Sequence, residues 1–259
     1  MLRFFGKIRK RLLTKNLWNA PGSPVAKYLL YALGEIVLVV IGILIALQIN
    51  TWNENRKNRI EERTILQSLA ENLSVAKRQS ERFIAEEDTL KSRLIRILGI
   101  DAKSSHSPIP PIPDSIFKSA VWDLQSDQPT FNAYANLKNT NKLSLIKNKQ
   151  LNERFTDLEF HQNKLNDILE DRLSVHQIRI DDILENDINF IPLVKANIRE
   201  IDLSNEPSNN YRLLVENTRI RNLLGMKLAF TQDVLNLRAN LDEEIEKLST
   251  LIAAELQGD

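Results

Sequence analysis

Few residues in this chain have the type and spacing that catalytic or metal chemistry needs. The three histidines are His106, His161 and His176, and no His-Glu-x-x-His run is present. On a shared helix, at ~1.5 Å per residue, His161 and His176 would be ~22 Å apart, which is too far for one metal ion. The histidines therefore do not predict a metal centre.

The acidic and nucleophilic residues do not form a recognisable catalytic site either. Asp181, Asp182, Glu185 and Asp187 lie close together, but a charged helix face explains them better than a metal site does. The seven glycines are scattered rather than gathered in a phosphate-binding loop, cysteine is absent, and no motif places a serine nucleophile. We therefore expect no enzyme activity, no cofactor and no metal ion.

Glu35 has the strongest functional signal, because it lies within an otherwise apolar stretch. A carboxylate inside a bilayer costs a few kcal/mol unless it is paired, hydrated or protonated. Glu35 could titrate or contact a partner subunit. Alternatively, it lies only ~12 Å along a helix from Lys27 and reaches headgroup water with little penalty. The sequence leaves both interpretations open.

The apolar stretch runs from Leu29 to Ile49 and is long enough to cross a membrane. It has 21 residues with one charge, and at ~1.5 Å per residue it would form ~31 Å of helix, the thickness of the hydrocarbon core. Tyr28 and Tyr31 at one end and Trp52 at the other are the aromatic residues expected at the two membrane interfaces. We predict a transmembrane helix over residues 25–51.

The charges on either side of this helix predict its orientation. Residues 1–27 hold seven basic and no acidic residues, whereas the other 28 basic and all 34 acidic residues give residues 28–259 a net charge of −6. Positive charge marks the cytoplasmic side, and the apolar run is too long for a cleaved signal peptide. We expect a signal anchor in a bacterial inner membrane, with residues 1–24 in the cytoplasm and residues 52–259 in the periplasm.

The basic tail is a candidate for contact with membrane lipids. Phe5, Ile8 and Leu12 would share one face of a helix, which suggests a short helix on the membrane surface. A disordered tail that only sets the topology is the alternative. The side chains expected to contact lipid headgroups are Lys7, Arg9, Lys10 and Arg11. Because the rest of the chain is mildly acidic, we expect no nucleic-acid partner.

A pair of small residues in the membrane helix favours self-association. Gly42 and Ala46 are four residues apart, and Glu35 lies on the same helical face. Small-xxx-small pairs let two membrane helices approach closely. The expected partners are therefore further copies of this chain or other envelope proteins.

The segment after Trp52 predicts an amphipathic helix that continues directly from the membrane helix and ends at Gly99. Its apolar face is interrupted by two polar residues, Ser80 and Glu87. The positions of this face, at alternating spacings of three and four, are Leu66, Leu69, Leu73, Ala76, Ser80, Phe83, Glu87, Leu90, Leu94 and Ile97. They could form an intermolecular coiled coil, but packing within the chain is favoured because further helices follow.

The remainder of the chain predicts helices separated by short breaks. A proline-rich segment, residues 104–113, is expected to link helices at the surface, with partner binding as the less favoured alternative. Short helices are expected over residues 115–124 and 130–137, a long one from about residue 149 to 184, and a last one over residues 211–256. The apolar stripe of the last helix is Leu214, Leu224, Leu228, Leu235, Leu241, Ile245, Leu248 and Ile252. We predict an all-α protein in which one transmembrane helix continues into an elongated up-and-down helical bundle.

The run KYLLYALGEIVLVVIGILIALQINTWNENRK, residues 27–57, resembles the N-terminal signature of an uncharacterised family of small bacterial single-pass membrane proteins. The shared features are the core at residues 34–50, the Trp-Asn-Glu at residues 52–54 and the basic, aromatic start of the chain. The segment KLSLIKNK at residues 142–149 also resembles a recurring feature of the family. The resemblance implies an inner-membrane protein with a periplasmic helical domain, and it implies no activity, cofactor or catalytic residue.

Three functions are compatible with these features. The favoured one is a structural or interaction protein, an anchored helical bundle that self-associates or scaffolds an envelope complex. The second is a periplasmic sensor or ligand-binding module that acts through a partner, by analogy with other periplasmic four-helix bundles. The third is a proton- or ion-coupled membrane unit in which Glu35 titrates within an oligomer.

Overall fold

A computed structural model describes residues 24–101 and 111–258, and every regular element in these ranges is helical. The prediction of an all-α protein is confirmed. The chain divides into two compact units, residues 1–59 and 60–259. The lipid-contact candidates Lys7, Arg9, Lys10 and Arg11 lie outside the described residues, as does most of the proline-rich segment.

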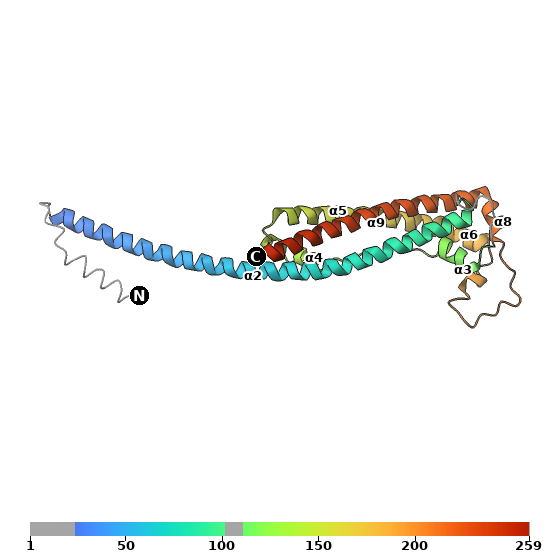
Figure 1. The fold of residues 1–259 in the computed structure, drawn as a ribbon, viewed down its shortest axis with the longest axis horizontal. Coiled ribbons are helices and arrows are strands. Elements are labelled where there is room, and N and C mark those ends of the chain that lie inside the picture. The colour runs from blue at the N-terminus through green and yellow to red at the C-terminus, as the bar shows by residue number, and fades with distance from the viewer. Residues whose placement is uncertain (1–23, 102–110, 259) are drawn as a thin grey trace. The chain divides into compact units, whose positions relative to one another are not determined.

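The first described helix, α2 (Pro24–Leu98), contains both the apolar stretch and the amphipathic stretch (Figure 1). Neither glycine nor proline occurs between Gly42 and Gly99, so nothing in the sequence breaks the helix there. Gly99 adopts a φ of 64°, which is a left-handed conformation that glycine tolerates at a helix end. The predicted end of this helix is confirmed.

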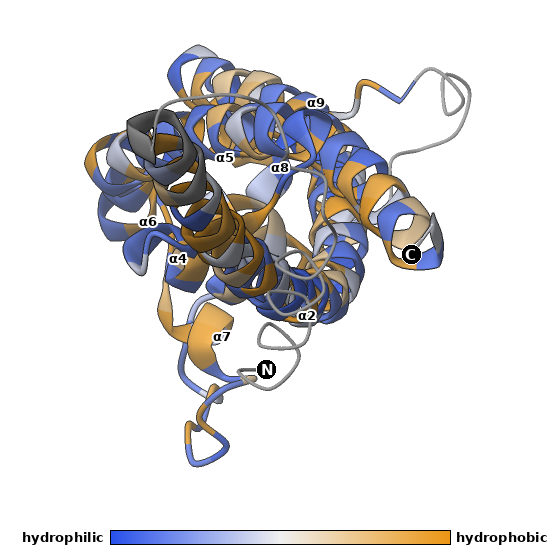
Figure 2. Cartoon of the chain, turned by 90° about the vertical axis from the view of Figure 1, so that its left-hand side faces the viewer, coloured by the Kyte–Doolittle hydropathy of each residue, from blue (hydrophilic) through white to orange (hydrophobic). Residues whose placement is uncertain are grey.

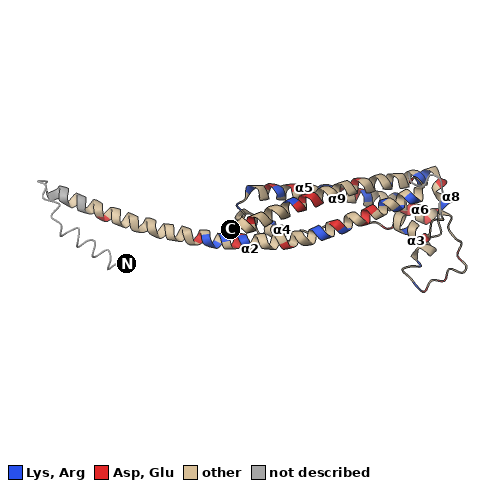
Figure 3. Cartoon of the chain, in the orientation of Figure 1, with Lys and Arg blue, Asp and Glu red and all other residues tan. Residues whose placement is uncertain are grey.

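In the first unit, the described part of α2 is long and apolar enough to cross a membrane. Residues 33–59 are exposed on every side, and most side chains up to Ile49 are large and apolar. No charged residue lies between Glu35 and Glu54, and Figure 3 shows this stretch of α2 as an uncharged run. An exposed apolar surface of this length is what a membrane span requires.

The second unit is a bundle whose long helices are residues 60–98 of α2, α5 and α9, which run side by side (Figure 1). Its elements after α2 are α3 (Asp114–Phe117), η1 (Lys118–Trp122), α4 (Asn132–Asn139), η2 (Lys142–Leu145), α5 (Lys149–Val175), η3 (His176–Ile180), α6 (Asp181–Asn186), α7 (Ile191–Val194), α8 (Tyr211–Glu216) and α9 (Thr218–Gly258). The short turns η1 and η3 are π-helical, and η2 is a 3₁₀ turn.

The amphipathic face of α2 packs inside this bundle. All ten of its predicted positions are buried, and these include the two polar ones, Ser80 and Glu87. The prediction that the face packs within the chain is therefore confirmed. Figure 2 shows that α5 and α9 likewise carry both hydrophobic and hydrophilic residues, as helices with one buried side do.

Two apolar clusters form the core of the bundle. One joins residues 65–76 of α2 to the first part of α5 and the second part of α9. The other joins residues 90–98 of α2 to η1, α6 and the start of α9. Ser80, Phe83 and Glu87 of α2 belong to neither cluster, so the core changes its chemistry between them.

The predicted last helix, residues 211–256, is wrong in one respect, because α8 and α9 are separated at Asn217. The backbone of Asn217 leaves the helical region, with a ψ of 119°. Its side-chain Oδ1 accepts hydrogen bonds from the backbone N–H groups of Arg219, at 2.9 Å, and Ile220, at 3.5 Å. Asn217 is thus the N-cap of α9, a role that asparagine favours over the helix interior.

Replacing Leu165 by Ala is expected to lower the free energy of unfolding by about 2–5 kcal/mol, because its fully buried side chain would leave a cavity in the first apolar cluster. Urea unfolding followed by circular dichroism, with the protein in a mild detergent, measures the change. The exposed neighbour Asn163 provides the control, and Asn163→Ala should stay within about 0.5 kcal/mol. A loss below about 1 kcal/mol for Leu165→Ala would contradict this packing.

Candidate functional site

The residues predicted to act in the membrane helix have no partner among the residues of the first unit that the structure describes. Glu35 and Ala46 are exposed. A Cβ atom added at Gly42 would meet nothing within 4 Å, so this face of the helix is open. Tyr28 and Trp52 are also exposed, whereas the side chain of Tyr31 lies outside what the structure describes.

The acidic residues around Asp182 form a charged surface that is paired within the chain. The guanidinium of Arg219 donates to Asp182 Oδ2 at 2.7 Å and also to Asp187. The hydrogen bond from Arg219 lowers the pKa of Asp182 below its usual value. Among the residues that the structure describes, no three His, Cys, Asp or Glu side chains are grouped as metal ligands would be.

The histidines predicted as isolated occupy different environments. His106 lies outside the described residues. His161 is partly exposed and packs edge-on against Phe160, with ring centres 5.4 Å apart. His176 is buried at the start of η3, beside a set of charged side chains. This set is the candidate site.

Five buried titratable or charged side chains, Glu87 included, interact with one another, and we call them the charge layer. Glu87 comes from α2, Arg172 from the last turn of α5, His176 from η3, and Lys227 and Arg238 from α9. Each is less than 8% exposed, and Glu87 is completely buried. Such side chains are rarely found inside proteins unless they are paired.

Glu87 is the carboxylate shared by the two arginines. Arg172 Nη1 donates a hydrogen bond to Glu87 Oε1. Arg238 Nε lies 3.6 Å from Glu87 Oε2, which is an ionic contact longer than a hydrogen bond. The guanidinium of Arg238 also lies over the ring of Phe83, 5.3 Å from the ring centre, so part of its charge faces an aromatic surface.

All three basic side chains of the layer also donate to backbone carbonyls of one short part of the chain. Arg172 Nη2 donates to the carbonyl of Gln125, and Arg238 Nη1 donates to the carbonyl of Asp127 at 3.0 Å. Lys227 Nζ donates to the carbonyl of Val121 at 2.5 Å. Val121 lies in η1, and the other two lie in the non-helical residues 123–131, which we call the connecting segment.

These contacts give a physical reason for burying the charges. Residues 124–130 of the connecting segment lack the regular hydrogen bonds of a helix, so their carbonyls need other donors. Long basic side chains supply such donors from α5 and α9. The segment is also held from α2, where Gln79 Oε1 accepts from the backbone N–H of Thr130 at 2.9 Å and Glu86 accepts from Gln125 Nε2 at 2.6 Å.

The basic groups of the layer have shifted proton affinities. Burial, and after it the positive charge of Arg172, lower the pKa of Lys227 to about 7, against opposing effects of Asp123, Glu87 and Asp181. Burial and the neighbouring charge of Lys227 lower the pKa of His176 to about 4. Because titratable groups with shifted pKa values gather at functional sites, the charge layer is the functional candidate in the second unit.

Several polar atoms of the layer have no hydrogen-bond partner in the described structure. They are Glu87 Oε2, Arg172 Nε, His176 Nδ1, and Arg238 Nε and Nη2. Two π-helical turns also meet the layer, since η1 carries Val121 and η3 begins at His176. Incomplete hydrogen bonding and π turns both occur preferentially at functional positions.

A second candidate is a polar groove of about 710 Å³ between α4 and α5. Its one carboxylate, Glu159, is occupied by Tyr134 and Lys138. The groove is otherwise rich in side-chain amides, namely Gln128, Asn132, Asn139, Gln162, Asn163 and Asn166. Amides both donate and accept hydrogen bonds, so this surface suits an uncharged polar partner.

One sequence feature indicated the charge layer, namely the pair of polar interruptions at Ser80 and Glu87 in an otherwise apolar face. Arg172, Lys227 and Arg238 were missed, because long basic residues on a helix are normally exposed. The predicted stripe of α9 used Leu228 and Leu235, which are only partly buried, while the adjacent Lys227 is buried.

Comparison of the chain with curated proteins and with solved structures gives no significant match. The resemblance to an uncharacterised family is confirmed by a family model. Residues 35–94, from Glu35 through most of the amphipathic part of α2, match a family of unknown function, DUF6090.

Proposed function

We propose that this chain is a membrane-anchored structural or interaction protein of the bacterial inner membrane, whose helical bundle lies in the periplasm. One observation carries the anchoring: residues 33–49 expose apolar side chains on all sides of α2. A soluble protein rarely presents so large an exposed apolar surface, and lipid would cover it.

The charge distribution supports the orientation. The seven basic residues that precede the apolar helix favour a cytoplasmic N-terminus, and the acidic remainder places no comparable positive charge on the other side. The bundle of residues 60–259 would then lie on the periplasmic side.

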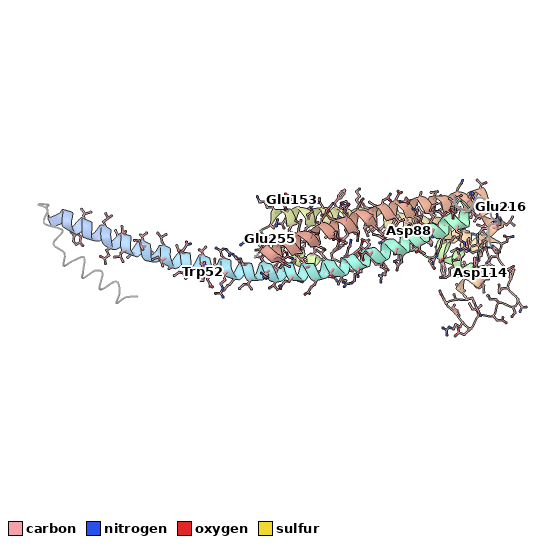
Figure 4. All side chains as sticks on the ribbon, in the orientation of Figure 1. Trp52, Asp88, Asp114, Glu153, Glu216 and Glu255 are labelled. Atoms are coloured by element: carbon pink, nitrogen blue, oxygen red, sulfur yellow. The ribbon has the colours of Figure 1, made fainter. Side chains whose placement is uncertain are left out.

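Because the chain has no cysteine, single-cysteine variants report this orientation without background labelling. Glu153, labelled in Figure 4, is exposed on α5. We expect Glu153→Cys to react with a membrane-impermeant maleimide in cells with a permeabilised outer membrane. Lys15→Cys, in the basic tail, should react only after the inner membrane is disrupted. The opposite pattern, or labelling of both before disruption, would contradict the proposed orientation.

An interaction role is supported by the surface and core of the bundle. The buried basic side chains donate to the chain's own carbonyls and to Glu87, and their burial keeps them from contact with a substrate. The groove between α4 and α5 offers uncharged amides rather than a nucleophile beside a base. Amides of this kind could pair with a polar partner in the envelope, which is what a scaffolding protein would need.

Self-association would use the open face with Gly42 and Ala46. Close approach of two helices at small residues should bring the Ala46 positions of two copies within disulfide reach. We expect Ala46→Cys in native membranes to form a crosslinked dimer on mild oxidation. Leu44→Cys, on the opposite side of the helix, is the matched control and should crosslink far less. Equal crosslinking at both positions, or none at Ala46→Cys, would argue against this interface.

A sensor role is the second candidate, and the charge layer is the observation that favours it. A structural bundle has no need of a buried lysine whose pKa lies near 7, whereas a protein that responds to its surroundings can use one. The two roles are compatible, because a scaffold can change its partners when its bundle changes.

A further inference from the structure

The charge layer contains more positive than negative groups. Arg172, Lys227 and Arg238 are all at most 5% exposed, and Glu87 is the one carboxylate within the layer. Three further carboxylates that act on its basic groups, Asp123, Asp181 and Glu86, are about half exposed and stand at its edge. Buried charges that are not compensated are strongly destabilising. With every basic group protonated, the layer therefore holds an excess of positive charge.

Lys227 is the group that can relieve this excess by releasing a proton. Arginine stays protonated at all ordinary pH values, whereas a buried lysine changes its charge readily. The charged and titratable groups that face Lys227 from the surrounding elements are Glu87 of α2, Asp123 of the connecting segment, Arg172 of α5, His176 of η3 and Asp181 of α6. Arg238, on the same helix as Lys227, shares Glu87 with Arg172.

Of the chain segments that cover the charge layer, the connecting segment can move away with the least disruption of the bundle. Residues 124–130 have no helical hydrogen bonds, and they are held by side chains from α2, α5 and α9. At the end of the segment, Phe131 packs in the first apolar cluster. The helices around it are held by their backbone ladders and by the two apolar clusters. Segments held by few regular hydrogen bonds open at lower free energy than packed helices do.

We propose that Lys227 is a proton-binding site whose occupancy controls the connecting segment: the segment is closed over the layer when Lys227 is neutral, and proton uptake by Lys227 favours its release. In the closed layer, a protonated Lys227 is desolvated and repelled by Arg172. When the segment opens, water reaches Lys227 and the cost of its charge falls. Proton binding and opening therefore favour each other.

The proton affinity of Lys227 supports this coupling. Its pKa is lowered from 10.5 to about 7 in the closed layer, with burial as the larger cause and Arg172 as the next. Opening should return the pKa toward 10.5, so a fall in pH from 9 to 7 shifts the equilibrium toward the open segment. If the full difference is realised, linkage gives a shift in the opening equilibrium of roughly 50-fold, and we expect roughly 10- to 50-fold.

Hydrogen–deuterium exchange on the full chain in a mild detergent tests the proposal. Amides are compared at pH 7 and pH 9 after correction for the intrinsic exchange rates. We expect peptides covering residues 121–131 to open roughly 10- to 50-fold more often at pH 7 than at pH 9. Peptides covering residues 151–165 of α5 should change little. His176 does not contribute to this comparison, because its pKa of about 4 lies below the pH range from 7 to 9.

Two variants separate Lys227 from other titrating groups. Lys227→Met should remove the pH dependence of residues 121–131, whereas Lys149→Met, at an exposed position of α5, should keep it. The proposal is overturned if Lys227→Met keeps the wild-type pH dependence or if the wild type shows none. Should Lys227→Met fail to fold, the side-chain ¹⁵N signal of Lys227 in the wild type decides: titration near pH 7 supports the proposal, and titration near pH 10 refutes it.

Discussion

Replacing Glu87 by Gln is expected to lower the free energy of unfolding of the bundle by about 3–5 kcal/mol. The substitution keeps the size of the side chain but removes its charge. Arg172 and Arg238 would then face each other and Lys227 without a carboxylate between them. Breaking a buried ion pair by removing one partner costs this much because the remaining charges stay desolvated.

Urea unfolding of the full chain in detergent, followed by circular dichroism, measures the loss. Asp88 is the control, because it follows Glu87 on α2 and is exposed (Figure 4). Asp88→Asn should change the free energy by no more than about 0.5 kcal/mol. If Glu87→Gln costs less than about 1 kcal/mol, the carboxylate does not hold the layer together.

A double variant tests whether the loss arises from unpaired charge. Adding Arg238→Met to Glu87→Gln removes one of the two stranded guanidinium groups. We expect the double variant to lose at least about 1 kcal/mol less than the sum of the two single variants, because residues in one ionic network are coupled. Additive losses would show instead that each side chain contributes through its own packing.

The fold was largely readable from the sequence because its dominant signals are periodic. The apolar face of α2 alternates spacings of three and four over ten positions, and all ten are buried. Gly99 marked the end of the helix for a stereochemical reason that holds in any context. Both signals depend on local residues alone, which is why they could be read without knowing the tertiary structure.

The charge layer could not be read in the same way. A lysine or arginine on the buried face of a helix has the same local sequence pattern as one on an exposed face. The sequence around Lys227 and Arg238 therefore did not indicate that these two residues are buried. Their burial is explained by the carbonyls that they reach, Val121 in η1 and Asp127 in the connecting segment, which lie about 100 residues earlier in the chain. The break at Asn217 was missed for a simpler reason, since asparagine occurs both inside and at the start of helices.

The two polar residues in the apolar face of α2 differ in how well they predict the charge layer. Glu87 indicated the layer because burying a carboxylate on an apolar helix face costs free energy unless the carboxylate has partners. Here its partners are two arginines. Ser80 is buried beside the layer without a charged partner that would explain it. A polar residue in an apolar face therefore predicts a site best when it carries a charge.

The free energy of unfolding is expected to rise with pH between 7 and 9, by about 2 kcal/mol. Lys227 binds its proton with a pKa near 7 in the folded chain and near 10.5 when exposed. Between these values the unfolded chain holds a proton that the folded chain lacks. Unfolding therefore takes up a proton, and raising the pH favours the folded state.

Other titratable groups limit the pH range of high stability on both sides. Below it, His176 has a folded pKa of about 4 against 6.5 when exposed, so stability falls further as the pH drops from 6.5 to 4. Above it, burial raises the pKa values of Tyr134 and Tyr211, and the ion pairs of Lys77 raise its pKa. Their stabilising contributions are lost once the unfolded tyrosines ionise, above about pH 10. The chain should thus be most stable near pH 9–10, above the usual range of pH 5–8.

Urea unfolding at a series of pH values from 5 to 10 measures this profile. Lys227→Met should lose the rise between pH 7 and 9 and keep the fall below pH 6.5, because His176 is still present. Lys149→Met should follow the wild type throughout. A wild-type profile that is flat or falls between pH 7 and 9 would mean that Lys227 keeps its proton in the folded chain. The excess positive charge of the layer would then have to be balanced in some way other than the release of that proton.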